Sequence, residues 1–253
     1  MNNYDLLPAV RRSDLWELKK SPAHYLYKVT HREEPTTALL FGTTAHKYIL
    51  EPDDFWNHYA LAPEVDKRTK AGKAEWAEFV ENLGDKQPIS ASDYKVIVEM
   101  DDAIKTHQTA SALLKTGQHE IPITWKDPTT GEMCKCRPDC LTEYHGRKYI
   151  VDYKTTSSCE DGSFEYSCRS YGYKLQAGMY TEGVFQTSLD NCGFAFVAQE
   201  KKEPYAVRVY FCDPGFVEEG MDLFHELIEI LHRCKQTNTW PGYEDRGLYA
   251  DER

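Results

Sequence analysis

Two aspartates and a lysine form the most chemically distinctive spacing in the sequence. Twelve residues separate Arg137-Pro138-Asp139 from Asp152-Tyr153-Lys154. If these segments lie on neighbouring antiparallel strands, Asp139 can face Asp152, and side-chain alternation puts Asp152 and Lys154 on one face. Facing carboxylates repel unless a cation lies between them, and hard oxygen ligands suit Mg²⁺ or Mn²⁺. The Lys154 ammonium could then orient an attacking water or stabilise charge on a phosphate.

Four further residues could serve the same chemistry. Glu120, on a predicted first strand, could extend the acidic cluster. Gln176 and Tyr180 are four apart on a predicted helix and share one face, so they could orient a water or a phosphate oxygen. His46, on an N-terminal helix, could add a nitrogen ligand. Plainer roles stay open: an ordinary helix histidine for His46, a core position for Tyr180 and a strand end for Glu120.

The elements that must position these residues follow from the hydrophobic pattern. Three strands of an antiparallel meander are predicted over 120–125, 132–144 and 148–153. A helix over about 168–186, strands near 192–199 and 204–212, and an amphipathic helix over 214–236 are predicted after them. Ahead of them we expect two short helices within 11–28 and further helices from 42–44 to Leu50, over 70–83 and over 92–115.

This order of elements predicts an α/β (α+β) fold, a mixed β-sheet flanked by helices with an N-terminal helical elaboration. We expect one domain over residues 1–240, mainly helical over 1–116 and carrying the catalytic core over 117–240. A loosely ordered tail is expected over 241–253. Ser21 followed by Pro22 is typical of a helix start, with serine as the N-cap.

Composition sets the class of protein. The chain has 253 residues, of which 41% are hydrophobic, enough for a sizeable core. No apolar stretch approaches the ~20 residues that span a bilayer, and the first residues lack the build of a signal peptide. We therefore expect a soluble, intracellular protein without a membrane partner. Its eight cysteines are then expected to be mostly reduced thiols.

The balance of charge argues against a broad nucleic-acid surface. The chain has 30 basic and 41 acidic residues, a net charge of −11, whereas DNA-binding proteins usually show a basic footprint. Affinity depends on the local field, however, and a local basic run is present. It comprises Lys67, Arg68, Lys70 and Lys73. Two interpretations of this run stay open. It could be the solvated start of a helix, or it could be a DNA-binding loop that contacts phosphates.

A cysteine group precedes the second aspartate. Cys134, Cys136 and Cys140 are spaced differently from the paired cysteines of structural zinc sites. The chain also has no earlier cysteine and no tight late trio of cysteines. We therefore expect no zinc or iron–sulfur site here.

The motifs together resemble a known family. The spacing of Asp139, Asp152 and Lys154 matches the PD-(D/E)XK nuclease superfamily, and the chain resembles the C-terminal nuclease domain of the exodeoxyribonuclease VIII (RecE) family. The matching stretches are SDLWELKKSPAHYLY, FGTTAHKYILEP, APEVDKRTKAGK, ITWKDPTTGEMCKCRPD, VDYKTT, YGYKLQAGMYTEG and TNTWP. They run almost from end to end, and the superfamily has a restriction-endonuclease-like core.

The resemblance implies a Mg²⁺-dependent 5′-to-3′ exonuclease on linear double-stranded DNA, with Mn²⁺ able to substitute. It also implies a ring-like homo-oligomer, with a tetramer favoured, a single-strand-annealing protein as partner and the bacterial cytoplasm as the site of action, for a bacterial or a phage protein. The residues that match family site positions are His46, Glu120, Asp139, Asp152, Lys154, Gln176 and Tyr180. The metal would be held by Asp139, Asp152, the Tyr153 carbonyl and His46, while Lys154, Glu120, Gln176 and Tyr180 would support catalysis.

Two rival functions stay open. An endonuclease of the same superfamily would cut a closed circle, which an exonuclease leaves intact. A non-catalytic protein that binds DNA ends during recombination would hold an end without releasing nucleotides. The sequence disfavours this second rival, because every expected site position carries a chemically competent residue.

Overall fold

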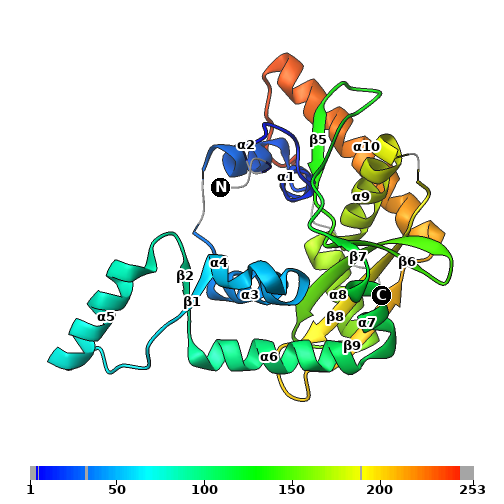
Figure 1. Ribbon diagram of the computed structural model, residues 1–253. Helices are drawn as coiled ribbons and strands as arrows, with labels where there is room; N and C mark the ends of the chain where they lie inside the picture. Colours follow the sequence, from blue (N-terminus) through cyan, green and yellow to red (C-terminus); the bar gives the residue numbers. More distant parts are fainter. Residues whose placement is uncertain (1–3, 5, 32–33, 189, 246–253) are drawn as a thin grey trace, which may run out of the picture.

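A five-stranded mixed sheet lies at the centre of the protein, whose computed structural model describes residues 4, 6–31, 34–188 and 190–245 (Figure 1). In spatial order its strands are β3 (Gln118–His119), β6 (Cys140–Tyr144), β7 (Arg147–Thr156), β8 (Gly193–Glu200) and β9 (Val207–Phe211). β7 and β8 run parallel, and the other neighbours are antiparallel. The predicted mixed α/β fold class is therefore confirmed.

Helices precede and flank this sheet. In chain order they are α1 (Arg12–Leu18), α2 (Pro22–Thr30), α3 (Thr37–Leu50), the 3-10 turn η1 (Pro52–Asp54), α4 (Phe55–His58), α5 (Lys70–Leu83), α6 (Ala91–Thr106), α7 (Gln108–Lys115), α8 (Asp161–Tyr171), α9 (Tyr173–Ser188) and α10 (Pro214–Thr237). The predictions over 70–83 and 214–236 agree closely with α5 and α10. The Ser21 hydroxyl accepts a hydrogen bond from the His24 amide, so the predicted N-cap is also confirmed.

Two of the predicted helices are each divided into two shorter helices in the structure. The one over 92–115 ends at His107, whose backbone is extended and whose Nδ1 accepts a hydrogen bond from the Ala110 amide at 3.2 Å, so His107 caps α7. The helix predicted over 168–186 is divided at Gly172, which has a φ of 69°. Glycine adopts this conformation without strain, and a Cβ there would lie 2.4 Å from Trp16. Both breaks arise from caps and contacts that the hydrophobic period does not encode.

Side chains of the central strands alternate between two cores. Ile150 and Phe196 belong to the core beneath α9 and α10, whereas Val151 and Tyr153 belong to the core that includes residues of α6 and α7. Because β7 is covered on both faces, its sequence is a nearly continuous apolar run.

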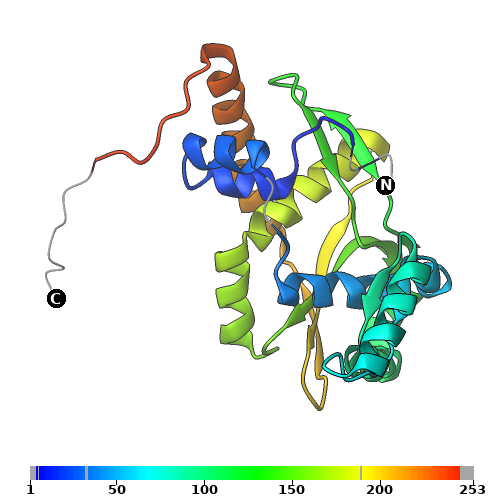
Figure 2. The same ribbon diagram turned by 90° about the vertical axis from the view of Figure 1, so that its left-hand side faces the viewer.

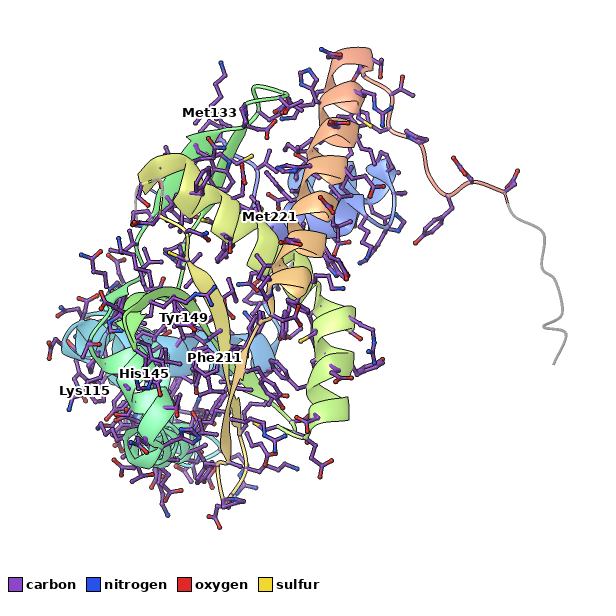
Figure 3. All side chains as sticks on the ribbon, turned by 90° about the vertical axis from the view of Figure 1, so that its right-hand side faces the viewer. Lys115, Met133, His145, Tyr149, Phe211 and Met221 are labelled. Atoms are coloured by element: carbon purple, nitrogen blue, oxygen red, sulfur yellow. The ribbon has the colours of Figure 1, made fainter. Side chains whose placement is uncertain are left out.

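Figure 2 shows α1 and α2 beside α10. At the edge, the Tyr149 ring lies 5.3 Å from that of Phe211 on β9 (Figure 3).

The predicted three-stranded meander is wrong as a single sheet. β4 (Ile123–Lys126) and β5 (Met133–Cys136) form a separate two-stranded antiparallel sheet around the turn at 127–131. The strand predicted over 132–144 is interrupted between β5 and β6. Pro138 lies in this break, and proline cannot donate a ladder hydrogen bond. Glu120 lies outside any strand, after β3, with a φ of 52°. Residues 137–139 therefore lie between the two sheets, outside both ladders.

Residues 59–89, which we call the arm, project from the body at the left of Figure 1. β1 (Tyr59–Leu61) and β2 (Gln87–Ile89), two strands that the sequence did not predict, pair in parallel at its base. α5 connects them and begins at its N-cap Thr69, whose hydroxyl accepts from the Gly72 amide. Most side chains of α5 are exposed.

The segment after α10 contacts α2. The Pro241 carbonyl accepts a hydrogen bond from the Ala23 amide at 3.0 Å, and the rings of Tyr25 and Trp240 stack at 5.6 Å. Residues 241–245 form no regular element, and the rest of the predicted tail, 246–253, lies outside the described residues. Across the described ranges, each helix is too short or too polar to cross a bilayer.

Candidate metal-dependent active site

Asp139 and Asp152 lie next to the same pair of opposed residues on two neighbouring strands. Cys140 of β6 pairs with Val151 of β7, so Asp139 immediately precedes this pair and Asp152 immediately follows it. Asp139 Oδ2 accepts a hydrogen bond from the Tyr153 amide at 2.7 Å. Both carboxylates are buried, with 9% of Asp139 and 1% of Asp152 exposed. The strand pairing therefore brings the two aspartates side by side, as their spacing predicts.

Asp152 is held by two partners. The Lys154 Nζ lies 2.5 Å from Asp152 Oδ2, which places these residues on one face of β7. The Gln176 side-chain amide, from α9, donates to Asp152 Oδ1. Gln176 Oε1 is buried and has no hydrogen-bond partner among the described residues, so it can accept from a water or a ligand. The Asp152 carboxylate is therefore held by one side chain from β7 and by one from α9.

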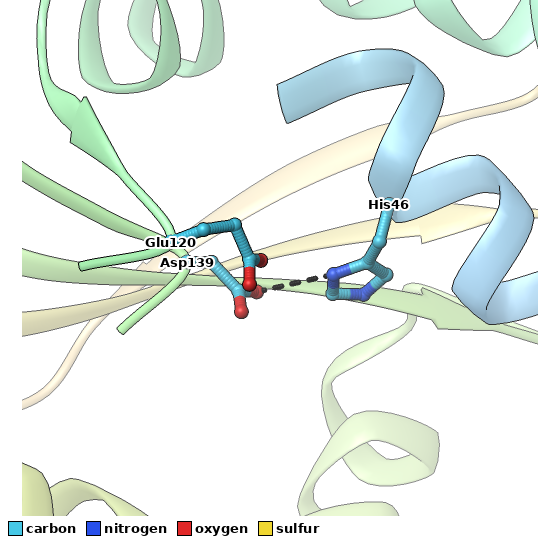
Figure 4. A group of neighbouring side chains, drawn as sticks. All are labelled: His46, Glu120 and Asp139. Atoms are coloured by element: carbon cyan, nitrogen blue, oxygen red, sulfur yellow. Dashed lines mark ion pairs between the residues drawn. The ribbon is translucent and has the colours of Figure 1, made fainter. Parts of the chain in front are cut away.

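Asp139 belongs to a different group, which we call the trio: His46, Glu120 and Asp139. One ligand atom from each lies within 4.8 Å of the others, and the three side chains converge in Figure 4. His46 Nδ1 lies 3.4 Å from Asp139 Oδ2. One imidazole nitrogen and two carboxylates form a donor set that suits Mn²⁺ or Mg²⁺ and leaves positions for water or phosphate oxygens. The residues of the trio thus fit a divalent cation.

The electrostatics of the trio also suit a cation. Burial, helped by the positive charge of Lys154, lowers the pKa of His46 to about 3, so its ring is neutral and offers a lone pair. Burial and the negative charge of Asp152 raise the pKa of Asp139 well above its usual value. Burial likewise raises the pKa of Glu120. A bound cation would relieve this crowding of carboxylates.

Glu120 reaches the trio through an unusual backbone conformation. Its φ of 52° is rare for a residue with a side chain. The Glu120 amide donates to the Asp139 carbonyl at 3.2 Å, and the Glu120 carboxylate lies 2.7 Å from Arg137 Nε. Sequence reasoning assigned no role to Arg137. Its position two residues before Asp139 is a signal that could have found it.

Of two aromatic residues near the site, Tyr173 contacts Lys154 and Tyr180 packs against the core beneath α9 and α10. Tyr180 lies one helical turn beyond Gln176 on α9, and burial raises its pKa well above the usual value, with smaller effects from Asp152 and Asp139. Its hydroxyl therefore stays protonated and can donate. The Lys154 Nζ lies 4.8 Å from the centre of the Tyr173 ring, which stabilises the ammonium by a cation–π contact. Sequence reasoning did not single out Tyr173.

The basic run lies on the arm rather than among the site residues. Lys67 and Arg68 are in the loop before α5, and Lys70 and Lys73 are in its first turn. Lys67 Nζ lies 3.0 Å from the centre of the Trp76 ring, and Arg68 pairs with Asp66 at 2.9 Å.

The cysteines before the second aspartate are packed in the protein interior. Cys134 and Cys136 join the core beneath α9, and Cys140 Sγ contacts the Leu113 carbonyl at 3.4 Å. Burial raises the pKa of Cys134 and of Cys140 to about 12. Each thiol is therefore protonated near neutral pH.

Comparison with known proteins identifies the family. The family model of the PDDEXK-like domain of unknown function (DUF3799) matches residues 12–251. The chain belongs to this family. Membership confirms the predicted PD-(D/E)XK superfamily, and a search of curated proteins gives no match.

A solved structure shares the overall fold of this chain. A crystal structure from Eubacterium rectale, described as a "Putative exonuclease", has a TM-score of 0.65 and 16% identity, and the alignment covers 97% of this chain and 91% of that one. At this identity, the likeness shows the fold. The crystal structure of SSO0001 has a TM-score of 0.32 and 14% identity over 85% of this chain and 84% of that one, too weak a likeness to argue from.

Proposed function

We propose that this PDDEXK-like chain is a Mg²⁺-dependent exodeoxyribonuclease that hydrolyses linear double-stranded DNA from 5′ to 3′. The observation that carries the proposal is the trio of possible metal ligands beside the Asp152–Lys154 pair. The family and the exonuclease description of the similar structure support nuclease activity in general. Mg²⁺ as the natural ion, with Mn²⁺ able to replace it, rests on the donor set and the resemblance.

Each side chain has a role in this proposal. The trio, with Asp152 and the Tyr153 carbonyl, would hold one or two ions, and bound metal would acidify a water and stabilise the leaving oxygen. Lys154, beside Asp152, orients the water or balances charge on the scissile phosphate. Gln176 holds the Asp152 carboxylate, and the protonated Tyr180 hydroxyl can donate to a phosphate oxygen.

The finer features of the proposed activity rest on the resemblance to the exodeoxyribonuclease VIII family. These are the 5′-to-3′ polarity, a ring-like homo-oligomer around the DNA with four subunits, and a cytoplasmic role in leaving 3′ single strands for an annealing protein. The arm supplies Lys67, Arg68, Lys70 and Lys73 to the DNA backbone in this proposal. Their exposure supports it, because exposed cations neutralise phosphates without reading sequence.

Digestion of linear duplex labelled at its 5′ or 3′ ends, with and without Mg²⁺, tests the proposal beside a covalently closed circle. We expect Mg²⁺-dependent early release of the 5′ label, later release of the 3′ label and an intact circle. Linearisation of the circle would instead show an endonuclease. End binding without nucleotide release in Mg²⁺ or Mn²⁺ would show a binding protein and contradict the proposal.

A further inference from the structure

Arg137 is the cation that contacts the Glu120 member of the trio. Arg137 Nε lies 2.7 Å from Glu120 Oε2, with 35% of the Arg137 side chain and 19% of the Glu120 side chain exposed. A partly buried guanidinium–carboxylate pair is stronger and more directional than an exposed one. A carboxylate offers about four lone-pair sites, so the pair with Arg137 leaves Glu120 able to contact a cation as well.

The same two segments are joined a second time through the backbone. The Glu120 amide donates to the Asp139 carbonyl, and His119 pairs with Cys140 just beyond. Glu120 is therefore fixed to residues 137–140 by its backbone and by its side chain. This double attachment explains how a non-glycine residue keeps a φ of 52°, a strained conformation that persists only where surrounding contacts enforce it.

The other side of Arg137 is also constrained. Its guanidinium lies 5.3 Å from the centre of the Tyr4 ring, within the range of a cation–π contact. Arg137 is joined through Pro138 to Asp139, another member of the trio. A single short segment thus carries one possible metal ligand and the group that orients a second.

From this geometry we propose that Arg137 is a positioning residue, which holds the Glu120 carboxylate toward His46 and Asp139 and so sets the affinity of the trio for a divalent cation. The inference rests on the proposed function, because it takes the trio as the metal site. A positive charge near a cation by itself weakens cation binding. If Arg137 acts by positioning Glu120, its removal should weaken cation binding. If it acts only through its charge, its removal should strengthen cation binding.

The test measures Mn²⁺ binding by calorimetry on the full chain without DNA. The variants are Arg137→Ala, Arg137→Lys, Glu120→Gln and the double variant Arg137→Ala/Glu120→Gln. Arg147→Ala is the matched control, because Arg147 also lies over a tyrosine ring, that of Tyr149, but away from the trio.

We expect Arg137→Ala to weaken Mn²⁺ affinity about tenfold, as loss of a group that orients a metal ligand typically does. Arg137→Lys, which keeps the charge but loses the planar guanidinium over the Tyr4 ring, should weaken it by about threefold. In the Glu120→Gln background, Arg137→Ala should change affinity by less than about twofold, since coupled residues are non-additive. Arg147→Ala should match the unmodified chain.

Three outcomes would overturn the inference. They are tighter Mn²⁺ binding in Arg137→Ala, unchanged binding in Arg137→Lys, and an equal loss from Arg137→Ala with and without the Glu120 carboxylate. If Arg137→Ala does not fold, Arg137→Lys decides by itself. An unmodified chain that binds no Mn²⁺ would overturn the proposed function as well. A chain that binds Mn²⁺ in the expected pattern but cuts no DNA would overturn only the nuclease proposal.

Discussion

The candidate site on the central sheet and the arm differ in how firmly their charged side chains are held. At the sheet, Asp152 is 1% exposed and contacts both Lys154 and Gln176. On the arm, the side chain of Arg68 is 92% exposed and pairs only with its neighbour Asp66 among the contacts that the described residues make. One region is arranged before any ligand arrives, and the other presents its charges to solvent.

This contrast separates chemistry from substrate binding. Preorganised groups stabilise a transition state because they need not reorganise during the reaction. Exposed cations add affinity for a polyanion by releasing its counterions, an effect that salt weakens. Changes at the sheet should therefore affect turnover, whereas changes on the arm should affect DNA affinity and its dependence on salt.

The largest effect is expected from Asp152→Asn. The variant keeps the shape of the side chain but removes a negative charge beside the trio and the partner of Lys154. We expect Mg²⁺-dependent release of nucleotides to fall by about a thousandfold or more, which corresponds to about 4 kcal/mol of transition-state stabilisation. Circular dichroism should show an unchanged fold. Activity within tenfold of the unmodified chain would contradict the assignment of Asp152.

Lys154→Met should have the next largest effect. Methionine retains much of the apolar stem but cannot orient water or offset phosphate charge, so we expect turnover at saturating DNA to fall by about a hundredfold. Lys148→Met is the matched control on the same strand, since Lys148 pairs with Asp190 at the exposed end of β7. Equal losses in the two variants would show that Lys154 has no special role.

The sequence predicted the relative placement of Asp139, Asp152 and Lys154 better than it predicted the surrounding strands. The spacing of Asp139, Asp152 and Lys154 depends on strand alternation and one register, both local properties, and the structure has them. The conformation of Glu120 depends instead on Arg137 and on the Asp139 carbonyl. Such contacts join segments that the spacing of hydrophobic residues along the sequence does not pair. The division of the meander into two sheets could not be predicted for the same reason.

The resemblance placed His46 among the metal ligands, but the hydrophobic pattern alone could not group it with Asp139 and Glu120. Facing aspartates suggested one ion between Asp139 and Asp152, but the structure groups Asp139 with His46 and Glu120, while Lys154 and Gln176 hold Asp152. His46 comes from α3, far away in the chain. Its pairing with Asp139 needs the packing of α3 against β7, which no local pattern reveals.

The arm should give a smaller effect of a different kind. Replacing Lys67, Lys70 and Lys73 by alanine should weaken affinity for linear duplex about tenfold. It should also reduce the slope of log affinity against log salt by up to about 3, one for each phosphate that a lysine no longer neutralises. Fluorescence anisotropy in Ca²⁺ over a range of salt measures both quantities.

A control with the same loss of charge sharpens this comparison. Lys20, Lys105 and Lys148 each pair with a nearby carboxylate, so their joint replacement by alanine should leave the salt slope nearly unchanged. If the slope of log affinity against log salt falls equally in both triple variants, the arm has no particular role. Net charge alone would then explain DNA affinity.

The smallest effect concerns stability and follows from His46. Its pKa is lowered from 6.5 to about 3 in the folded chain, so between these values the unfolded chain binds more protons. Stability is therefore present above pH 6.5 and is lost as pH falls toward 3, by at most about 1.4 kcal/mol per pH unit for one proton. Because 26% of the side chain is exposed, screening should reduce the total to about 1 kcal/mol between pH 6.5 and 4.

Urea unfolding of the unmodified chain and of His46→Gln, both in chelator, isolates this contribution. Glutamine does not titrate, so the difference in unfolding free energy between the two proteins should shrink as pH falls, while the other titrating groups cancel. A difference that stays constant from pH 7 to 4 would show that His46 titrates normally in the folded chain. The neutral imidazole that the trio offers to a cation at mildly acid pH would then be absent, and metal binding would have to displace a proton from His46 as well.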